Sequence, residues 1–276
     1  MSDHAYQTQY RAEFVAGFEQ KQSLTRNTVT TEAMVKGNTA TFLVADSGSA
    51  TAVTRGLNGL IPARADNLTQ YSASLTEWHD LVRRTSYNIF SSQGDGRRIM
   101  QDTTMAVINR KIDDDIITEL NTATQDTGTT QTATLSMVMY GIAILGNNSV
   151  PLDGNVSALI TPAFHAYLMQ TKEFANVDYV NNKPFEGQMM SYRWAGVNFI
   201  VHPNLPGKAT TAEKCFLYHK NAIGHAINTG GIDTSVDYNA EHDYSFARCS
   251  AFMGSKILQN SGIVVLNHDG SAYAAQ

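Results

Sequence analysis

Residues 97–123 read RRIMQDTTMAVINRKIDDDIITELNTA, and this stretch decides the fold. Apolar side chains recur in it at every third or fourth position, namely Met105, Ile108, Ile112, Ile116 and Leu120. That spacing places them on one face of an α-helix. The sequence therefore predicts one long helix, a rod of about 35–40 Å at 1.5 Å per residue.

The segment after this helix alternates helices with strands. Residues 135–147 predict a second helix, and Thr161-Pro162 supplies the N-cap and first-turn proline of a third. Short apolar runs predict buried strands at residues 156–160, 197–201 and 214–218. This alternation indicates a compact α+β unit over residues 135–227.

The C-terminal part is again typical of strands. Residues 246–258 form a long extended run, and residues 263–266 form a short apolar one. Asn260-Ser261-Gly262 lies between them and is typical of a turn. The simplest prediction is a terminal hairpin.

The first 96 residues have a different character. Ser, Thr, Asn and Gln make up 32 of them, and no long amphipathic helix is evident. Apolar residues are nevertheless scattered throughout, which is too many for a solvated disordered tail. A long segment without a core of its own needs a functional reason. We expect its apolar residues to be buried on a neighbouring copy of the molecule.

Local patterns divide this first third further. Residues 12–22 could form one short helix, and residues 28–46 are rich in Thr and Val, as extended chain is. Two glycines and a proline within residues 55–62 indicate a turn region, and residues 68–82 are again typical of a strand. These features predict a long protruding loop of two extended strands with its tip near residues 55–64.

Composition narrows the class of protein. The 276 residues carry a net charge of −5, which argues against condensing nucleic acid through clustered Lys and Arg. Charged residues are only 16% of the chain, which suits a surface largely covered by contacts. Two cysteines give no disulfide framework and fit a reducing compartment. We expect no signal peptide, because no N-terminal run combines a basic start with an apolar stretch. We expect no membrane span, because the longest apolar stretch, residues 137–145, is too short.

The order of these pieces resembles the major capsid proteins of tailed bacteriophages, the Hong Kong 97-like fold. The segments Arg110–Ile117 and Asp243–Val265 are similar to the end of the spine helix and to the closing strands of that family. The resemblance implies an α+β fold with four parts. These are an N-terminal arm (1–46), an extended loop (47–80), a peripheral domain (81–131 and 227–276, with the spine helix at about 97–123) and an axial domain (132–226).

The resemblance also implies the partners. Many copies would assemble as hexamers and pentamers into an icosahedral shell around double-stranded DNA, without sequence-specific binding and without a membrane. There is no room here for the internal scaffolding domain that some members carry, so a separate scaffolding protein is implied, together with a portal and a decoration protein. The location would be the virion capsid, assembled in the bacterial host cytoplasm.

One departure from the family concerns covalent chemistry. The namesake protein joins a Lys in the extended loop to an Asn of a neighbour. Here no Lys occurs between Lys36 and Lys111. We therefore expect a shell without covalent cross-links.

Six residues are candidates for contacts between subunits. They are Arg55, Leu60, Ile61, Arg64, Asp66 and Trp78. The first five surround the predicted loop tip, and a Trp is a frequent anchor of interfaces. For Trp78 an ordinary position in the core is the equal alternative. Exposed charge pairs are individually weak, but in a shell each contact is repeated at every copy.

No catalytic, cofactor-binding or metal-binding residues are predicted. Consecutive carboxylates on a helix point in different directions, so we expect Asp113, Asp114 and Asp115 to form a solvated or subunit-contacting face. His202, His219, His225 and His242 lack the spacing of zinc ligands. Two alternatives remain open: an encapsulin-like nanocompartment shell protein of the same fold, and a cytosolic α+β hydrolase or metal enzyme.

Overall fold

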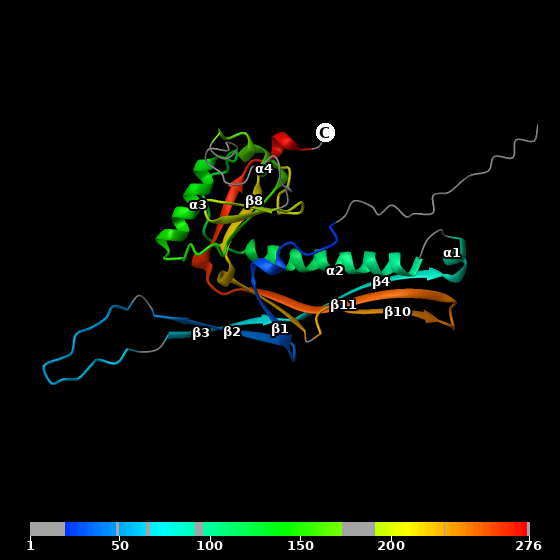
Figure 1. Ribbon diagram of the computed structural model, residues 1–276, viewed down its shortest axis with the longest axis horizontal. Coiled ribbons are helices and arrows are strands. Elements are labelled where there is room, and N and C mark those ends of the chain that lie inside the picture. The colour runs from blue at the N-terminus through cyan, green and yellow to red at the C-terminus, as the bar shows by residue number, and fades with distance from the viewer. Residues whose placement is uncertain are drawn as a thin grey trace, which may run out of the picture.

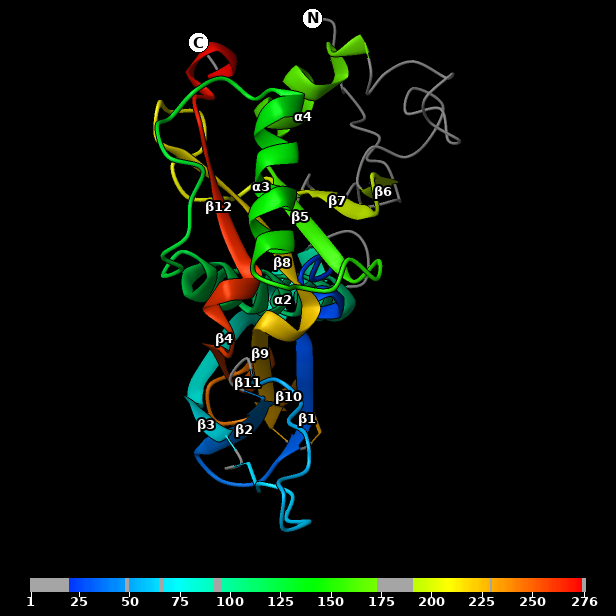
Figure 2. The same ribbon diagram turned by 90° about the vertical axis from the view of Figure 1, so that its left-hand side faces the viewer.

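The computed structural model describes residues 20–47, 50–64, 67–91, 96–172, 191–228 and 230–274. Within these ranges the strands form two five-stranded sheets and a separate two-stranded hairpin. The long helix α2 (Gly96–Leu120) lies between the two sheets, as Figure 2 shows most clearly. The hairpin projects from one end of this elongated arrangement (Figure 1).

Three described α-helices follow the prediction, namely α2, α3 (Leu135–Asn147) and α4 (Pro162–Met169). The short helix α1 (Ser86–Ser91) was not predicted. In α2 the predicted apolar face is confirmed, since Ile108, Ile112, Ile116 and Leu120 are all buried. The Thr161 hydroxyl accepts the Phe164 amide at 3.2 Å, which is the N-cap of α4 expected from Thr-Pro.

The first sheet lies along α2. Its strands run in the order β1-β9-β11-β10, and β4 pairs with the other edge of β11. The bounds are β1 (Thr30–Val35), β4 (Thr76–Thr85), β9 (Ile223–Asn228), β10 (Asp233–Asn239) and β11 (Tyr244–Ile257). Cys249 of β11 donates to the hydroxyl of Thr104 on α2 at 3.3 Å, so this face of the sheet is covered by the helix.

The second sheet forms the other half of the body. Its strands run in the order β12-β8-β5-β7-β6. The bounds are β5 (Val156–Ile160), β6 (Ser191–Trp194), β7 (Val197–Val201), β8 (Glu213–His219) and β12 (Ile263–His268). All five residues of the central strand β5 are buried. Helix α3 packs closely on this sheet, because a Cβ on Gly141 would lie 3.1 Å from the side chains of Leu217 and Leu266.

The predicted terminal hairpin is wrong. Strand β11 pairs with β4, β9 and β10 in the first sheet, whereas β12 pairs with β8 in the second. The turn at 260–262 is therefore the point where the chain crosses from one sheet to the other. A turn between two apolar strands looks the same in the sequence whether the strands pair with each other or separate.

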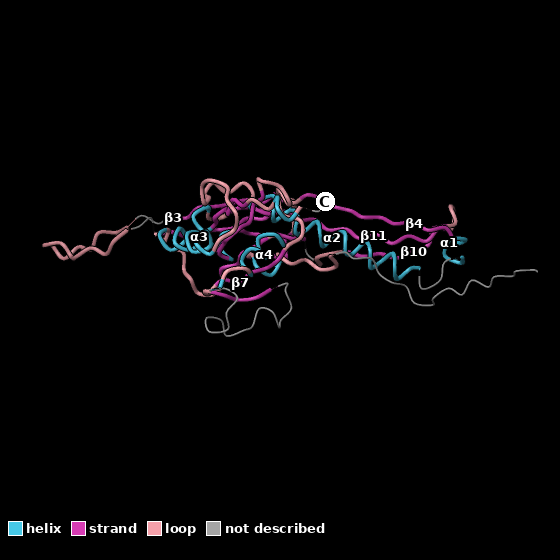
Figure 3. Tube along the Cα trace, turned by 90° about the horizontal axis from the view of Figure 1, so that it is seen from above, coloured by secondary structure: helices cyan, strands magenta, loops and turns pink. Residues whose placement is uncertain are grey.

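The protruding loop is present and begins earlier than predicted. Strand β2 (Thr39–Asp46) pairs antiparallel with β3 (Asn67–Ser74), from Thr39↔Ser74 to Asp46↔Asn67. Residues 39–46, which the sequence assigned to the arm, thus form one side of the hairpin. The predicted strand over 68–82 is divided at Leu75, where the chain leaves the hairpin and enters the first sheet. Figures 1 and 3 both show the hairpin extending away from the body.

The predicted boundary between the axial and peripheral domains also does not coincide with the division of the strands between the two sheets. The division at 226/227 falls inside β9, and β12 joins the sheet of the predicted axial domain instead of the peripheral one. Most of the predicted short helix at 12–22 lies outside the described residues, which begin at Gln20.

Candidate functional site: the projecting hairpin and the anchored arm

The tip of the hairpin is an exposed apolar surface. Every side chain in residues 50–64 is exposed to solvent. Leu57 is fully exposed, and Leu60 and Ile61 keep 75% and 65% of their surface accessible. Exposing large apolar side chains together is unfavourable in an isolated soluble protein and is typical of a contact site.

A tight turn holds the tip in shape. The Gly59 amide donates to the Gly56 carbonyl at 2.9 Å, and the Gly56 amide donates to the Leu60 carbonyl at 3.1 Å. Gly59 has φ of +74°, which favours glycine at this position. The turn predicted over residues 55–62 is thus confirmed.

The predicted charged contact residues have different surroundings. Arg55 is exposed on the tip. Arg64 donates from Nη1 to the Ser47 carbonyl at 3.1 Å, so it braces the two sides of the loop within one chain. Asp66 lies outside the described residues. The structure therefore exposes Arg55 at the tip and gives Arg64 a role inside its own hairpin.

Trp78 lies away from the tip. It is half-buried in β4 and packs against the main hydrophobic core. The Nζ atom of Lys111, on α2, lies 4.0 Å from the centroid of its ring. This position, between the first sheet and α2, corresponds to the core alternative for Trp78.

Asp113 of α2 holds the arm segment that precedes β1. Its two carboxylate oxygens accept hydrogen bonds from the Ser23 hydroxyl at 2.6 Å, the Thr25 hydroxyl at 2.6 Å, the Leu24 amide at 3.0 Å, the Thr25 amide at 3.1 Å and the Gln20 side-chain amide. Asp113 is only 1% exposed. We call residues 20–25 together with Asp113 the arm anchor.

The arm anchor also contacts His202, which directly follows β7 of the second sheet. The Nδ1 atom of His202 accepts the Asn204 amide at 3.2 Å, so the proton of a neutral ring lies on Nε2. That nitrogen lies 3.5 Å from Asp113 Oδ2, and both side chains are buried. Burial opposes ionisation of Asp113, but His202 and the hydrogen bonds from Ser23, Thr25 and Leu24 outweigh it and lower the pKa of Asp113 to about 2.

These contacts correct the prediction for the three consecutive carboxylates. Only Asp114 is fully on the solvated side. Asp113 is buried in the anchor, and Asp115 accepts the Ser255 hydroxyl of β11 at 2.6 Å. Burial raises the pKa of Asp115. The helix turns successive side chains by about 100°, so one carboxylate meets the arm, one meets solvent and one meets the first sheet.

Two of the chain crossings between the sheets meet at one junction. The 3₁₀ turn η2 (Lys220–Ala222) joins β8 to β9, and η3 (Asn260–Gly262) joins β11 to β12. The Ala222 carbonyl accepts the amides of Leu258 at 2.8 Å and Gln259 at 3.1 Å. These bonds fix the two sheets relative to each other.

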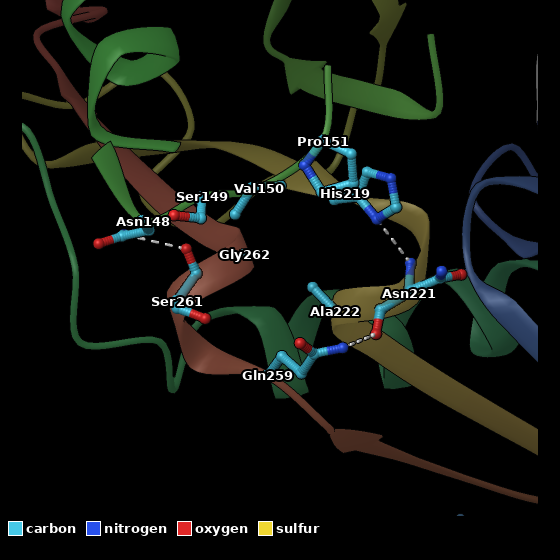
Figure 4. Close-up of a pocket in the computed structure, with 10 residues that line it drawn as sticks. All are labelled: Asn148, Ser149, Val150, Pro151, His219, Asn221, Ala222, Gln259, Ser261 and Gly262. Carbon is cyan, nitrogen blue, oxygen red and sulfur yellow. Dashed lines mark hydrogen bonds between the residues drawn. The ribbon is translucent and has the colours of Figure 1, made fainter. Parts of the chain in front are cut away.

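A polar cavity of about 190 Å³ lies at this junction (Figure 4). Asn148, Ser149, Asn221, Gln259 and Ser261 line it, together with the ring of His219. Both nitrogens of that ring are engaged, Nδ1 by the Asn221 amide at 3.2 Å and Nε2 by Asp153 at 3.3 Å. The arrangement offers amides and hydroxyls for binding within the junction and no histidine directed at a serine.

Among the described residues, no group of three or more His, Cys, Asp and Glu side chains is placed to hold a metal ion. None of the helices described is both long and apolar enough to cross a membrane. Four buried histidines each face one carboxylate, as His268 does with Glu213 at 3.5 Å. The buried His165 instead contacts the ring of Tyr192.

Comparison with known families decides the class of protein. Residues 2–270 match the family described as phage capsid protein. The chain belongs to this family. No match is found among curated proteins.

Solved structures share the fold of this capsid protein over almost its entire length. A structure from Mycobacterium phage Che8 matches with a TM-score of 0.77 at 14% identity, covering 97% of this chain and 98% of the other. The capsid of cyanophage P-SCSP1u matches with a TM-score of 0.75 at 14% identity, covering 96% and 93%. The capsid of cyanophage Pam1 matches with a TM-score of 0.73 at 11% identity, covering 98% of each chain.

These findings confirm the principal predictions. The capsid protein has the Hong Kong 97-like α+β fold, its function is that of a phage major capsid protein, and its location is the virion capsid. Its family is a structural one whose members form multimeric shells. Sequence reasoning found the exposed tip and missed the arm anchor, although Asp113 lies four residues before the buried Ile117 and so on the inner side of α2.

Proposed function

We propose that copies of this capsid protein assemble as hexamers and pentamers into an icosahedral shell that encloses the double-stranded DNA of a tailed bacteriophage. The observation that carries this proposal is the hairpin, whose exposed apolar tip stands clear of its own body (Figure 1). Such a tip gains free energy only when another molecule covers it. A second copy is the natural partner in a shell of identical subunits.

Apolar exposure continues along the hairpin. Leu43 on β2 and Leu68 on β3 keep 71% and 60% of their surface accessible. Both lie on one face of the ribbon, because Leu43 is opposite Gln70 and Ala45 is opposite Leu68 in the register. The contact surface thus includes one face of the strands as well as the tip, as large obligate interfaces require.

The arm anchor also supports the proposed assembly. Residues 20–25 are fastened to α2 through Asp113. An arm that starts at a fixed place can reach the same neighbour in every copy. The predicted contact residues Arg55, Leu60, Ile61 and Arg64 then belong to the hairpin side of this interface.

The proposed role includes further partners. A scaffolding protein and a portal would direct assembly in the bacterial cytoplasm, and a decoration protein would bind the finished shell. The net charge of −5 fits a wall that encloses DNA without binding its sequence. The role is structural and requires no catalytic residue.

The test is direct observation of particles. The expressed full-length protein, with co-expressed scaffolding protein where needed, is examined by negative-stain electron microscopy and sedimentation velocity. We expect closed shells with hexameric and pentameric units. A stable compact monomer with a protected N-terminal third would contradict the proposal, and particles that hold an enzyme cargo instead of DNA would indicate an encapsulin-like compartment.

We further predict that the shell is held without covalent links. No Lys lies between Lys36 and Lys111, so the whole hairpin lacks the amine that an isopeptide bond needs. Assembled particles, boiled with reductant and run on a denaturing gel, should give one band at the monomer mass of 30.2 kDa. A ladder of multiples of that mass would contradict this prediction.

A further inference from the structure

The base of the hairpin rests on small residues of the first sheet. Gly254 of β11 pairs with Ala226 of β9, and Gly224 of β9 pairs with Lys256. Gly224, Ala226 and Gly254 therefore lie on one face of the sheet. That face is turned away from α2, because the alternating neighbours His225 and Ser255 are the residues that approach Asp115 of the helix.

The hairpin touches this face at two points. A Cβ on Gly254 would lie 2.2 Å from the carbonyl oxygen of Ser74, the last residue of β3. A Cβ on Gly224 would lie 2.8–3.0 Å from the ring of Phe42 in β2. Figure 2 shows β2 and β3 beside β9 and β11, in agreement with these contacts. We call Gly224 and Gly254 the hairpin seat.

The seat requires glycine for space and not for backbone conformation. Neither glycine has a positive φ, so an alanine could adopt both backbones. Glycine inside a strand weakens it and is typical of a place where another backbone approaches closely. Here the approaching backbone is that of Ser74.

Because the hairpin is long, a small displacement at the hairpin seat produces a larger displacement at the tip. Each hairpin strand has eight residues, or about 26 Å of extended chain, and the tip loop extends further. An ordinary contact at Gly254 would need the Ser74 carbonyl to move by about 1 Å, from 2.2 to beyond 3 Å. A shift of that size at the base becomes several times larger at the tip.

We propose that Gly254 and Gly224 are positioning residues that set the angle at which the hairpin projects, and thereby which part of a neighbouring copy the tip reaches. This inference rests on the proposed function, since the angle matters only if the tip makes a contact. It assigns a role in assembly to two residues that themselves need not touch the neighbour.

The first measurement is made on the unassembled full-length chain. Spin labels are placed on L57C at the tip and T118C on α2, both exposed positions, while the native Cys215 and Cys249 are buried and stay unlabelled. The distance between the labels is measured by pulsed electron resonance in the wild-type background and with Gly254→Ala. We expect the mean distance to shift by about 5 Å or more, with an unchanged circular dichroism spectrum. An unchanged distance would overturn the proposal.

A second pair of variants tests the other half of the seat. Gly224→Ala should also shift the tip, and adding Phe42→Leu should return the distance toward that of the wild type, because the smaller side chain makes room for the new methyl group. Failure of Phe42→Leu to restore the distance would overturn the role of Gly224. This pair keeps the proposal testable if Gly254→Ala does not fold.

The control is Gly146→Ala in α3, where a new Cβ would meet nothing within 4 Å. It should change neither the tip distance nor assembly. In assembly assays we expect Gly254→Ala to reduce the yield of closed shells at least tenfold. A shifted tip with a normal yield of shells would overturn the link between angle and contact and would count against the proposed function, whereas an unshifted tip would overturn the seat alone.

Discussion

Replacing Asp113 by alanine should lower the free energy of unfolding by about 3–5 kcal/mol, because it removes one buried partner of a charged network. The substitution leaves the amides of Leu24 and Thr25 and two hydroxyls without their acceptor. The ring of His202 loses the carboxylate that faces it at 3.5 Å. Urea unfolding of the full-length, unassembled chain measures the loss.

A local measurement separates release of the arm from general destabilisation. Hydrogen exchange at the amides of Leu24 and Thr25 should rise in the Asp113→Ala variant well above its rise in β5. Asp114→Ala is the matched control, since Asp114 is exposed one position further along the same helix and should change stability by less than about 0.5 kcal/mol. Equal effects of the two substitutions, or full protection of Leu24 in Asp113→Ala, would show that the anchor does not hold the arm.

The stabilisation of the folded chain by Asp113 should also depend on pH. The pKa of Asp113 falls from its ordinary value of 3.8 to about 2 on folding, so its ionised form stabilises the folded chain above pH 3.8. This stabilisation, about 2 kcal/mol, is lost as the pH falls from about 4 through 2. The stability difference between wild type and Asp113→Ala should therefore shrink by about that amount between pH 5 and pH 2.

Replacing Leu60 or Ile61 by aspartate should abolish assembly while leaving the subunit folded. Burying a Leu or Ile side chain contributes about 1.5–3 kcal/mol, and a carboxylate placed in the same contact adds a desolvation cost. A loss of about 3 kcal/mol corresponds to more than a hundredfold weaker association at each contact. Because every subunit carries the same tip, the loss is repeated throughout the shell.

Sedimentation velocity measures the fraction of protein in particles, and thermal unfolding of the unassembled chain measures the fold. Thr54→Asp is the matched control, because it adds the same charge to an exposed polar position of the same loop. It should assemble to within a few-fold of wild type. Normal shells from Leu60→Asp and Ile61→Asp would show that the tip is not a contact.

The elements that sequence predicted well are those whose pattern is local. Helix α2 follows from an apolar repeat, α4 from Thr161-Pro162, and β5 from five apolar or small residues in succession. Each of these signals lies within the element itself. The sequence pointed to the capsid fold because the order of these elements is specific, even though the sequence signal of each single element is weak.

The failures concern pairing between distant segments. Strands β11 and β12 have the pattern of a hairpin, but β11 pairs with β4, 159 to 177 positions earlier, and β12 pairs with β8, 45 to 55 positions earlier. Asp113 was expected in solvent because its burial depends on Ser23 and Thr25, about 90 positions earlier in the chain. The sequence did contain one signal for the burial of Asp113, because this carboxylate follows Ile112 and lies four residues before Ile117. Using that signal would have required identifying the polar segment that binds the carboxylate.

Both sheets depend on strands near the C-terminus, and this determines when each sheet can be completed during synthesis of the chain. Strand β11 is the member of the first sheet that binds β4, β9 and β10, and β12 completes the edge of the second. The first sheet cannot be completed before Ile257 has been synthesised, and the second cannot be completed before His268. Pairing across such sequence distances is slow compared with helix formation. The residues of the hairpin are therefore synthesised before the strands that hold its base, and a complete subunit body forms only after this last region has been made.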